Sequence, residues 1–134
     1  MGLTGLFAGA AVLVAALGFG LFHRSRAGKL VAARVVFDFA SLGVRPGRVT
    51  LLQFSSAFCA PCRAVRVRCA SLASSSDVDH VEVDAESHLD AVRSLNVWKT
   101  PTLFIIDASG NVAGRIQGVP TLEQLRSAIG VVHA

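Results

Sequence analysis

Two cysteines separated by two residues carry the first chemistry that this sequence suggests. Cys59 and Cys62 stand in the segment Phe58-Cys59-Ala60-Pro61-Cys62. Thiols at this spacing can form and break a disulfide, supply half of a metal site, or serve as inert structural residues. A structural zinc site needs four ligands, and the histidines of the chain do not form a second paired motif. We therefore expect thiol–disulfide exchange and no bound metal.

The residues around this pair predict a strand before it and a helix after it. Val49–Phe54 is a short apolar run of strand character. Val65, Cys69 and Leu72 follow Cys62 at helical spacing, which indicates a helix with one buried face. The cysteine pair is therefore expected at the N-terminus of a helix.

That position affects the two cysteines differently. A helix N-terminus presents unpaired backbone N–H groups and the positive end of the helix dipole, and both favour a thiolate over a thiol. Only the thiolate attacks a disulfide. We expect Cys59 to be the nucleophile and Cys62 to resolve the mixed disulfide formed at Cys59. Pro61 fits here, because the first helical turn does not need its N–H.

The rest of the chain alternates between segments typical of strands and of helices. We expect a first strand at Val35–Phe37, a turn at Asp38–Gly43, a strand at Val78–Asp84, a helix at Ser87–Leu95 with Leu89, Val92 and Leu95 facing inward, a strand at Thr102–Asp107, a returning strand at Val112–Ile116, and a last helix with Leu122, Leu125, Ile129 and Val132 on its inner face. Strand–helix–strand alternation implies parallel pairing, and the late hairpin adds an antiparallel edge. The predicted fold class is α/β, with a central mixed sheet flanked by helices.

The N-terminal segment is apolar enough to cross a membrane. Leu3–Phe22 contains no charged residue and has about the length that a helix needs to span a hydrocarbon core of roughly 30 Å. We expect a transmembrane anchor at residues 1–22, a basic linker at 23–34 and a folded domain at 35–134. A cleaved signal peptide is the alternative, but its basic n-region is missing, since Arg24 is the first Lys or Arg.

The positive charge of the chain is concentrated beside this segment. Arg24, Arg26, Lys29 and Arg34 are four of the 13 Lys and Arg residues, which leaves nine against the nine Asp and Glu residues from Val35 onward. A nucleic-acid-binding domain needs a basic face on its folded part, so we expect no nucleic-acid partner. Basic residues flanking a membrane helix favour the cytoplasmic side. The domain is therefore predicted in the cytoplasm, with an extracytoplasmic domain as the alternative.

The order of these elements, with C-x-P-C at the start of a helix and Thr100-Pro101-Thr102 before a strand, resembles the thioredoxin superfamily. The resemblance runs from Val35 to the end of the chain. It implies a thioredoxin-like fold, a cis peptide bond before Pro101 beside the active-site sulfurs, and a reaction on disulfide-containing proteins without a cofactor. The upstream reductant stays unknown. The substrate-facing residues that it implies are Phe58, Ala60, Pro61, Thr100, Pro101 and Gly118.

Several residues depart from the usual pattern of that superfamily. Phe58 stands where Trp is usual, Gln53 where a buried Asp aids proton transfer, and His80 where a partnering Lys is usual. Because glutamine cannot act as a general base, we expect proton transfer through water or with help from His80. An ordinary strand-end role for His80 is the alternative. Trp98 is expected either to pack beneath the Pro101 loop or to form a wall of the substrate groove.

The third cysteine, Cys69, lies about 10 Å beyond Cys62 along a helix, which is too far for a disulfide. We expect a buried small apolar residue, with a regulatory thiol as the alternative. Arg63 and Arg66 either help to hold a thiolate or belong to a solvated helix face.

Together these features predict a membrane-tethered thiol–disulfide oxidoreductase that reduces protein disulfides. One alternative keeps the chemistry and moves the domain outside, as in thioredoxin-like proteins of cytochrome c maturation. The other is a redox-inactive binding module that uses the same groove, against which the intact pair of Cys59 and Cys62 argues.

Overall fold

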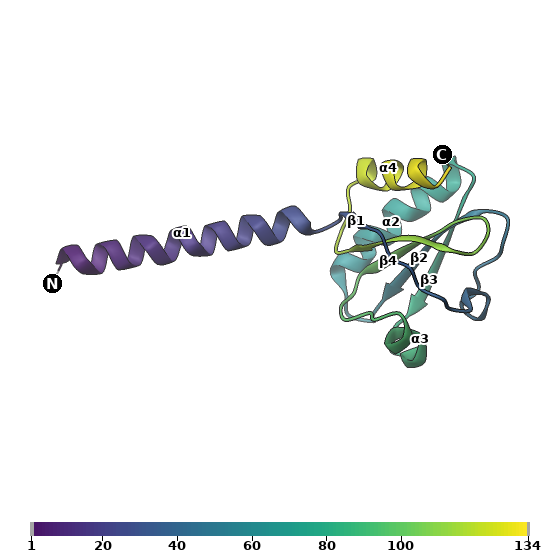
Figure 1. The fold of residues 1–134 in the computed structure, drawn as a ribbon, viewed down its shortest axis with the longest axis horizontal. Coiled ribbons are helices and arrows are strands. Elements are labelled where there is room, and N and C mark those ends of the chain that lie inside the picture. The colour runs from purple at the N-terminus through teal and green to yellow at the C-terminus, as the bar shows by residue number, and fades with distance from the viewer. Residues whose placement is uncertain (1, 134) are drawn as a thin grey trace.

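A five-stranded mixed sheet forms the centre of the folded part of the chain. The computed structural model describes residues 2–133, and Figure 1 shows their arrangement. The elements are α1 (Gly2–Arg26), β1 (Leu30–Val31), a 3-10 turn (Phe39–Leu42), β2 (Val49–Ser55), α2 (Ala60–Ser75), β3 (Val78–Asp84), α3 (Leu89–Ser94), β4 (Thr102–Ile106), β5 (Val112–Gln117) and α4 (Leu122–His133). The strand order is β1-β5-β4-β2-β3, with β2 and β3 parallel and the other neighbours antiparallel. This arrangement confirms the predicted α/β fold class.

Different elements cover the two faces of the sheet. On one face, Leu51 of β2 and Leu103 of β4 pack with residues of α2 and α4. On the other face, Phe54 and Phe104 meet edge to face, with ring centroids 5.8 Å apart, and pack with α3 and the 3-10 turn. Figure 1 shows α3 on the side of the sheet opposite α2 and α4. Every residue of β2 is buried, so the strand that leads to Cys59 lies between two packed layers.

The first strand lies earlier in the chain than the sequence predicted. Val35–Phe37 is not a strand, so that expectation was wrong. The edge strand is β1, which pairs antiparallel with β5 and lies inside the segment 23–34 expected to be a linker. Leu30 packs into the core beside Gly114, where a Cβ atom would stand 2.5 Å from the Leu30 Cδ1 atom. The missing side chain of Gly114 is therefore what lets a two-residue strand dock here.

Helix α3 is shorter than the expected helix at Ser87–Leu95. The Asp84 carboxylate accepts hydrogen bonds from the backbone N–H of Glu86 and the hydroxyl of Ser87. These bonds close a turn that delays the helix to Leu89, because short acidic side chains compete for backbone groups. Leu89 is exposed rather than turned inward, contrary to expectation.

Helix α1 stands apart from the sheet and its helices (Figure 1). It has 25 residues, and none of them is buried. An 18-residue window of it has a mean hydropathy of 2.2, so by length and composition the helix is able to cross a membrane; a signal sequence meets the same criteria.

Candidate active site at the N-terminus of α2

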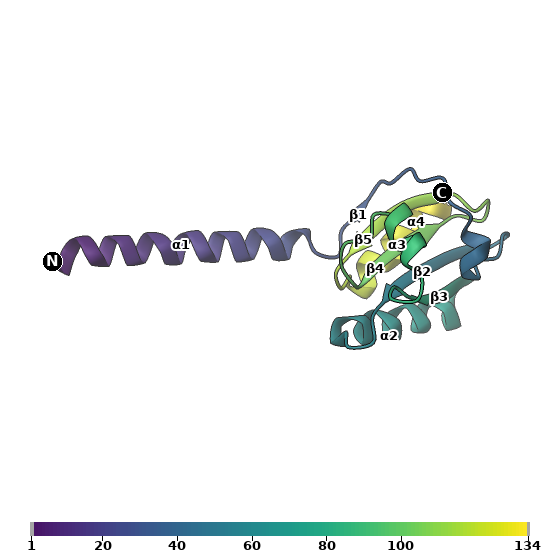
Figure 2. The same cartoon turned by 90° about the horizontal axis from the view of Figure 1, so that it is seen from below.

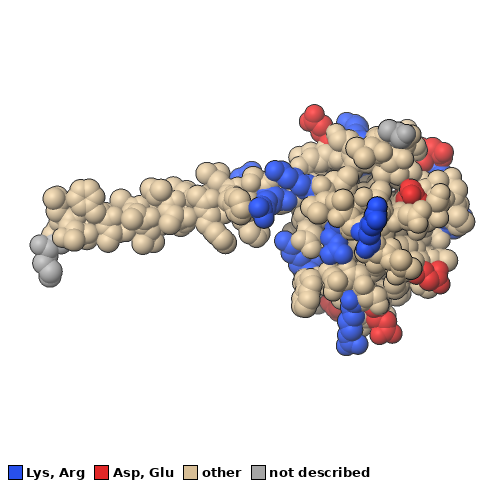
Figure 3. Space-filling model, viewed as in Figure 1, with Lys and Arg blue, Asp and Glu red and all other residues tan. Residues whose placement is uncertain are grey.

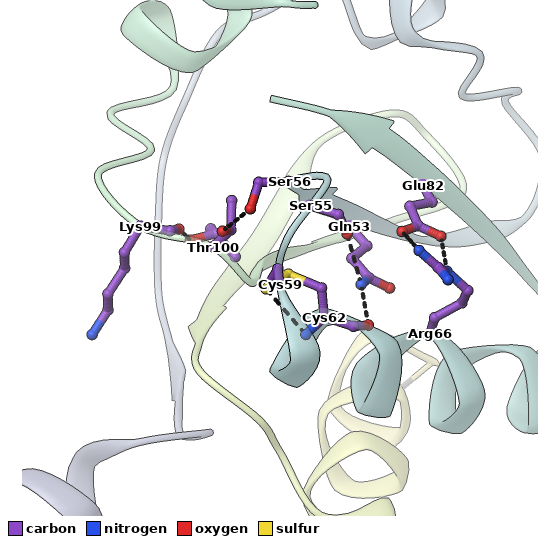
Figure 4. The surroundings of a disulfide bond; sticks show 10 residues. Gln53, Ser55, Ser56, Cys59, Cys62, Arg66, Glu82, Lys99 and Thr100 are labelled. Atoms are coloured by element: carbon purple, nitrogen blue, oxygen red, sulfur yellow. Dashed lines mark hydrogen bonds and ion pairs between the residues drawn. A yellow bond between two sulfur atoms is a disulfide. The ribbon is translucent and has the colours of Figure 1, made fainter. Parts of the chain in front are cut away.

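A disulfide between Cys59 and Cys62 lies where the chain passes from β2 into α2 (Figure 4). Cys59 is the N-cap residue of α2, and its Sγ atom accepts a hydrogen bond of 3.2 Å from the backbone N–H of Cys62. Donors at a helix N-terminus stabilise negative charge. In the reduced protein, the same N–H group therefore favours a thiolate at Cys59.

The two sulfur atoms differ in access. Cys59 is half-buried, whereas Cys62 is only 1% exposed and packs on the buried face of α2 with Val65, Cys69 and Leu72. This buried stripe confirms the helical spacing expected from the sequence. The geometry therefore gives the two sulfur atoms unequal access to a disulfide in solution, and their roles as attacking and resolving sulfur stay predictions.

The loop before β4 lies beside the disulfide. The peptide bond between Thr100 and Pro101 is cis, as the resemblance implied. The hydroxyls of Ser56 and Thr100 are 3.1 Å apart, which joins this loop to the segment that leads into Cys59 (Figure 4). The Thr102 hydroxyl donates to the carbonyl of Lys99 at 2.7 Å and holds the loop from its other end.

Gly118 is held against the same loop from β5. Its backbone N–H donates to the carbonyl of Pro101 at 3.0 Å, and its φ of +84° is one that glycine adopts readily. A Cβ atom at this position would lie 3.4 Å from the Cβ atom of Ala27. Gly118 thus lies close to the Pro101 loop and also beside the connection between α1 and β1.

The side chains around the disulfide are open to solvent. Phe58 is fully exposed, and Ala60 and Pro61 are exposed as well. Trp98 is 86% exposed, so packing beneath the Pro101 loop, one of its two expected roles, was wrong. Phe58 precedes Cys59 and Trp98 lies three residues before Pro101, so both segments that form the site carry an uncovered aromatic ring. The substrate contacts expected of Phe58, Ala60, Pro61, Thr100, Pro101 and Gly118 stay predictions.

Gln53 joins β2 to the helix that carries the disulfide. It is completely buried, and its Nε2 atom donates to the carbonyl of Cys62 and to the Ser55 hydroxyl, both at 2.9 Å (Figure 4). Its Oε1 atom lies 3.0 Å from the Nε2 atom of His80, which acts as the donor because the amide oxygen can only accept. The structure therefore brings together the two residues predicted for proton transfer, although neither is seen bonded to a sulfur atom.

A carboxylate that the sequence analysis did not select completes this cluster. Glu82 forms an ion pair with Arg66, with N–O distances of 2.5 and 2.6 Å. Hydrogen bonding to Arg66, with a smaller contribution from Ser55, lowers the pKa of Glu82. Arg66 is therefore engaged on β3 and does not hold a thiolate at Cys59. The sequence offered one indication of this ion pair. Arg66 lies one helical turn after Cys62, and Glu82 lies two residues after His80 on the expected strand.

The half-buried position of His80 makes stability depend on pH. Burial lowers the pKa of His80 below its ordinary value, and the nearby Arg66 adds to this effect, while Glu82 opposes it. At pH values between this lowered pKa and about 6.5, His80 is protonated to a greater extent in the unfolded chain than in the folded chain. The free energy of unfolding should therefore fall as the pH drops from 7.5 to 5, and it should fall less in His80→Gln. Urea unfolding of the detergent-solubilised chain, followed by circular dichroism, measures both; parallel curves would contradict the prediction.

Cys69 is a buried thiol, as expected, and burial raises its pKa to about 12. Since the thiolate is the reactive form, we expect iodoacetamide at pH 8 to label Cys59 of the reduced, folded protein and to leave Cys69 unmodified. Denaturation in urea should expose Cys69 and add its label. Peptide mass spectrometry measures each site, and labelling of Cys69 at the rate of Cys59 would contradict its inert role.

No group of three or more His, Cys, Asp and Glu side chains suited to hold a metal ion occurs within residues 2–133.

Comparison with known proteins adds a family and a fold. A family model described as Thioredoxin matches residues 38–130, whereas no curated protein sequence matches the chain. A mutant thioredoxin from Halobacterium salinarum superposes with a TM-score of 0.64 at 20% identity, covering 75% of this chain and 88% of the other. The reduced thioredoxin pre-protein of Schistosoma mansoni gives 0.60 at 20% identity, covering 69% and 87%. Fasciola hepatica thioredoxin gives 0.56 at 26% identity, covering 65% and 83%.

Proposed function

The chain belongs to the thioredoxin family, and from this premise we propose that it reduces protein disulfides while α1 holds it at a membrane. The observation that carries the proposal is the unequal access of its two sulfur atoms. Cys59 is reachable at the N-terminus of α2, and Cys62 is covered one turn later. A thioredoxin domain with a cysteine pair at disulfide distance supports a thiol–disulfide oxidoreductase.

The proposed reaction begins with both cysteines reduced. The Cys59 thiolate attacks one sulfur of a substrate disulfide, forms a mixed disulfide and expels the other substrate sulfur as a thiolate. The Cys62 sulfur, as its thiolate, then attacks the Cys59 sulfur and expels the second substrate thiolate. Two electrons pass to the substrate, and the enzyme is left with the disulfide present in the structure. A dithiol reductant returns it to the starting state.

The direction of the reaction is part of the proposal. The dipeptide Ala60-Pro61 between the cysteines is closer to that of family members that reduce than to that of strong oxidants, which often carry His at the second position. The alternatives keep the same site. One places the domain outside the cytoplasm as in thioredoxin-like proteins of cytochrome c maturation, and one is a redox-inactive binding module.

A turbidity assay tests the activity. The full chain in detergent should accelerate the precipitation of insulin by dithiothreitol well above the rate with dithiothreitol alone. An unchanged rate would contradict the reductase and favour the binding module.

Two further measurements test the membrane part of the proposal. We expect the full chain to stay with membranes after extraction at alkaline pH, because the uncharged segment Leu3–Phe22 is long enough to span the bilayer. Release into the soluble fraction would instead indicate a cleaved signal sequence. Reporter fusions at the C-terminus then give the topology: the basic residues after the helix favour a cytoplasmic domain, and a reporter active only in the exported compartment would assign the alternative.

A further inference from the structure

The connection between α1 and the folded domain is short and fixed at both ends. Helix α1 ends at Arg26, and the backbone N–H of Gly28 already donates to the carbonyl of Gln117 in β5 at 2.9 Å. Gly28 has a φ of +75°, and a Cβ atom there would lie 2.8 Å from both the Cα atom of Pro120 and the Oε1 atom of Gln124. The chain thus enters the domain two residues after the helix, in a space that fits only glycine.

This entry point adjoins the active site. Ala27 lies beside Gly118, where an added Cβ atom would be 3.4 Å from the Ala27 Cβ atom, and Gly118 donates its backbone N–H to the carbonyl of Pro101. The last turns of α1 also share a surface depression with Lys99, the residue before Thr100. Figures 1 and 2 agree that the N-terminal end of α2, which carries the disulfide, lies on the side of the domain from which α1 leaves.

The exposed residues on this side suit a lipid surface. Phe58, which precedes Cys59, and Trp98, which lies three residues before Pro101, are uncovered aromatic side chains, and aromatic residues are enriched where proteins meet lipid headgroups. Arg24, Arg26 and Lys29 surround the end of α1. Figure 3 shows Lys and Arg, and no Asp or Glu on the face in view, where the helix meets the domain. Such a charge pattern is attracted to anionic lipids.

The number of residues between the uncharged segment and the domain sets the height of the active-site side of the domain above the hydrocarbon core. The uncharged segment ends at Phe22, and Ala27 follows about 7 Å further along the helix axis. A headgroup layer is roughly 5–8 Å thick. Ala27, and with it the Pro101 loop, would therefore lie at the outer boundary of the headgroups.

From these contacts we infer that the short connection holds the mouth of the active site, with Phe58 and Trp98, against the membrane surface. The substrates would then be disulfides of membrane-attached proteins that lie close to the lipid headgroups. This inference rests on the proposed insertion of α1. It adds to the proposed function a fixed height of the active site above the bilayer. This height would favour substrates in the same membrane whose disulfides lie at that height.

Trp98 is the only tryptophan of the chain, so its fluorescence reports the position of the segment that leads to Pro101 without a label. The full chain, reconstituted in phosphatidylcholine and phosphatidylglycerol vesicles, should lose at least about half of its emission when spin-labelled headgroups are included. A variant with 20 Gly and Ser residues inserted between Arg26 and Ala27 should lose far less, because such a linker spans about 25 Å. The same insertion between Ser109 and Gly110, in the exposed β4–β5 turn, is the matched control and should leave the quenching unchanged.

Unquenched emission from the wild-type chain would overturn the inference, and so would equal quenching of the wild type and the Arg26 insertion variant. Flotation of the vesicles in the same experiment separates two failures. A chain that floats without quenching retains its anchor but has a distant active site. A chain that does not float contradicts both the anchor and the inference, whereas insulin reduction in detergent is independent of both.

A lipid-linked substrate tests the consequence for specificity. Two substrates carry the same disulfide peptide, joined to a lipid either by a short spacer or by a spacer of 60 Gly and Ser residues. We expect the vesicle-bound chain to reduce the short-spacer peptide at least about tenfold faster. The fixed height of the active site raises the effective concentration of the short-spacer peptide only. The Arg26 insertion variant should lose this preference and keep its rate on insulin. Equal rates of the wild-type chain on both peptides would overturn the inference.

Discussion

Replacing Cys59 by serine should lower the rate of insulin reduction above the dithiothreitol background by at least about 10³-fold, so that the observed rate equals that of dithiothreitol alone. Loss of a nucleophile removes the covalent step entirely, and losses of this size or larger are typical when a catalytic nucleophile is removed. Cys69→Ser is the matched control, because it also replaces one thiol of α2, but at a buried position that faces the core. Its rate should stay within about twofold of the wild type. Equal rates for the wild type and Cys59→Ser would contradict the proposed reaction.

Cys62→Ser should stop the reaction one step later. The accessible Cys59 still forms a mixed disulfide, but no second thiolate is present to release it. We therefore expect covalent adducts that disappear on reduction when this variant is expressed in cells, and none with the double variant Cys59→Ser/Cys62→Ser. Mass spectrometry of the adducts would identify the substrates. A trap without partners would favour the redox-inactive binding module.

The second large effect is expected at Gln53. Gln53→Glu keeps the shape of the side chain, but an ionised carboxylate would meet the Cys62 carbonyl in place of an amide donor. Burial raises the pKa of a carboxyl group, and here one carboxylate oxygen would face the Cys62 carbonyl while only the other keeps the His80 donor. The variant should therefore fold with its introduced carboxyl group protonated at low pH and lose stability as the pH rises through the ordinary value near 4.3 and above. We expect the free energy of unfolding to drop by about 2–4 kcal/mol relative to the wild type between pH 5 and pH 8.

Gln53→Leu separates this charge effect from the loss of hydrogen bonds. It leaves the Ser55 hydroxyl and the His80 ring without their amide partner, which should cost about 1–3 kcal/mol. That cost should not grow between pH 5 and pH 8, because leucine does not titrate. Urea unfolding of the three proteins at both pH values measures the difference. A pH-independent Gln53→Glu would show that the site tolerates a negative charge.

Gln53 stands where the superfamily usually has a buried acid. Its role in this site is therefore hydrogen bonding rather than proton transfer by its own side chain. The amide holds the carbonyl of Cys62, the Ser55 hydroxyl and His80 in one hydrogen-bonded group. It therefore supports the position of Cys62, while proton transfer through water or with His80 stays a prediction. The unfolding experiments on His80→Gln and Gln53→Glu address the two partners of this hydrogen bond separately.

The sequence by itself determined the features that local patterns encode. The apolar spacing after Cys62 located α2 and its buried face, and the run before Phe58 located β2, because helix and strand periodicities are written into neighbouring residues. Pro101 and the hairpin after it contributed to the family resemblance, and the prediction of a cis peptide bond depended on that resemblance. The uncharged run from Leu3 to Phe22 similarly predicted a long apolar helix.

Only the tertiary structure decided the contacts between residues far apart in the chain. Arg66 of α2 forms an ion pair with Glu82 of β3, and Trp98 is left largely exposed by the packing of residues 2–133. The edge strand at Leu30–Val31 forms because Gly114 leaves room for Leu30, and a two-residue strand is too short to carry a periodicity. That docking also decides from which side α1 leaves the domain. Pairing and packing between distant segments thus set the surroundings of the disulfide, which no local spacing of residues specifies.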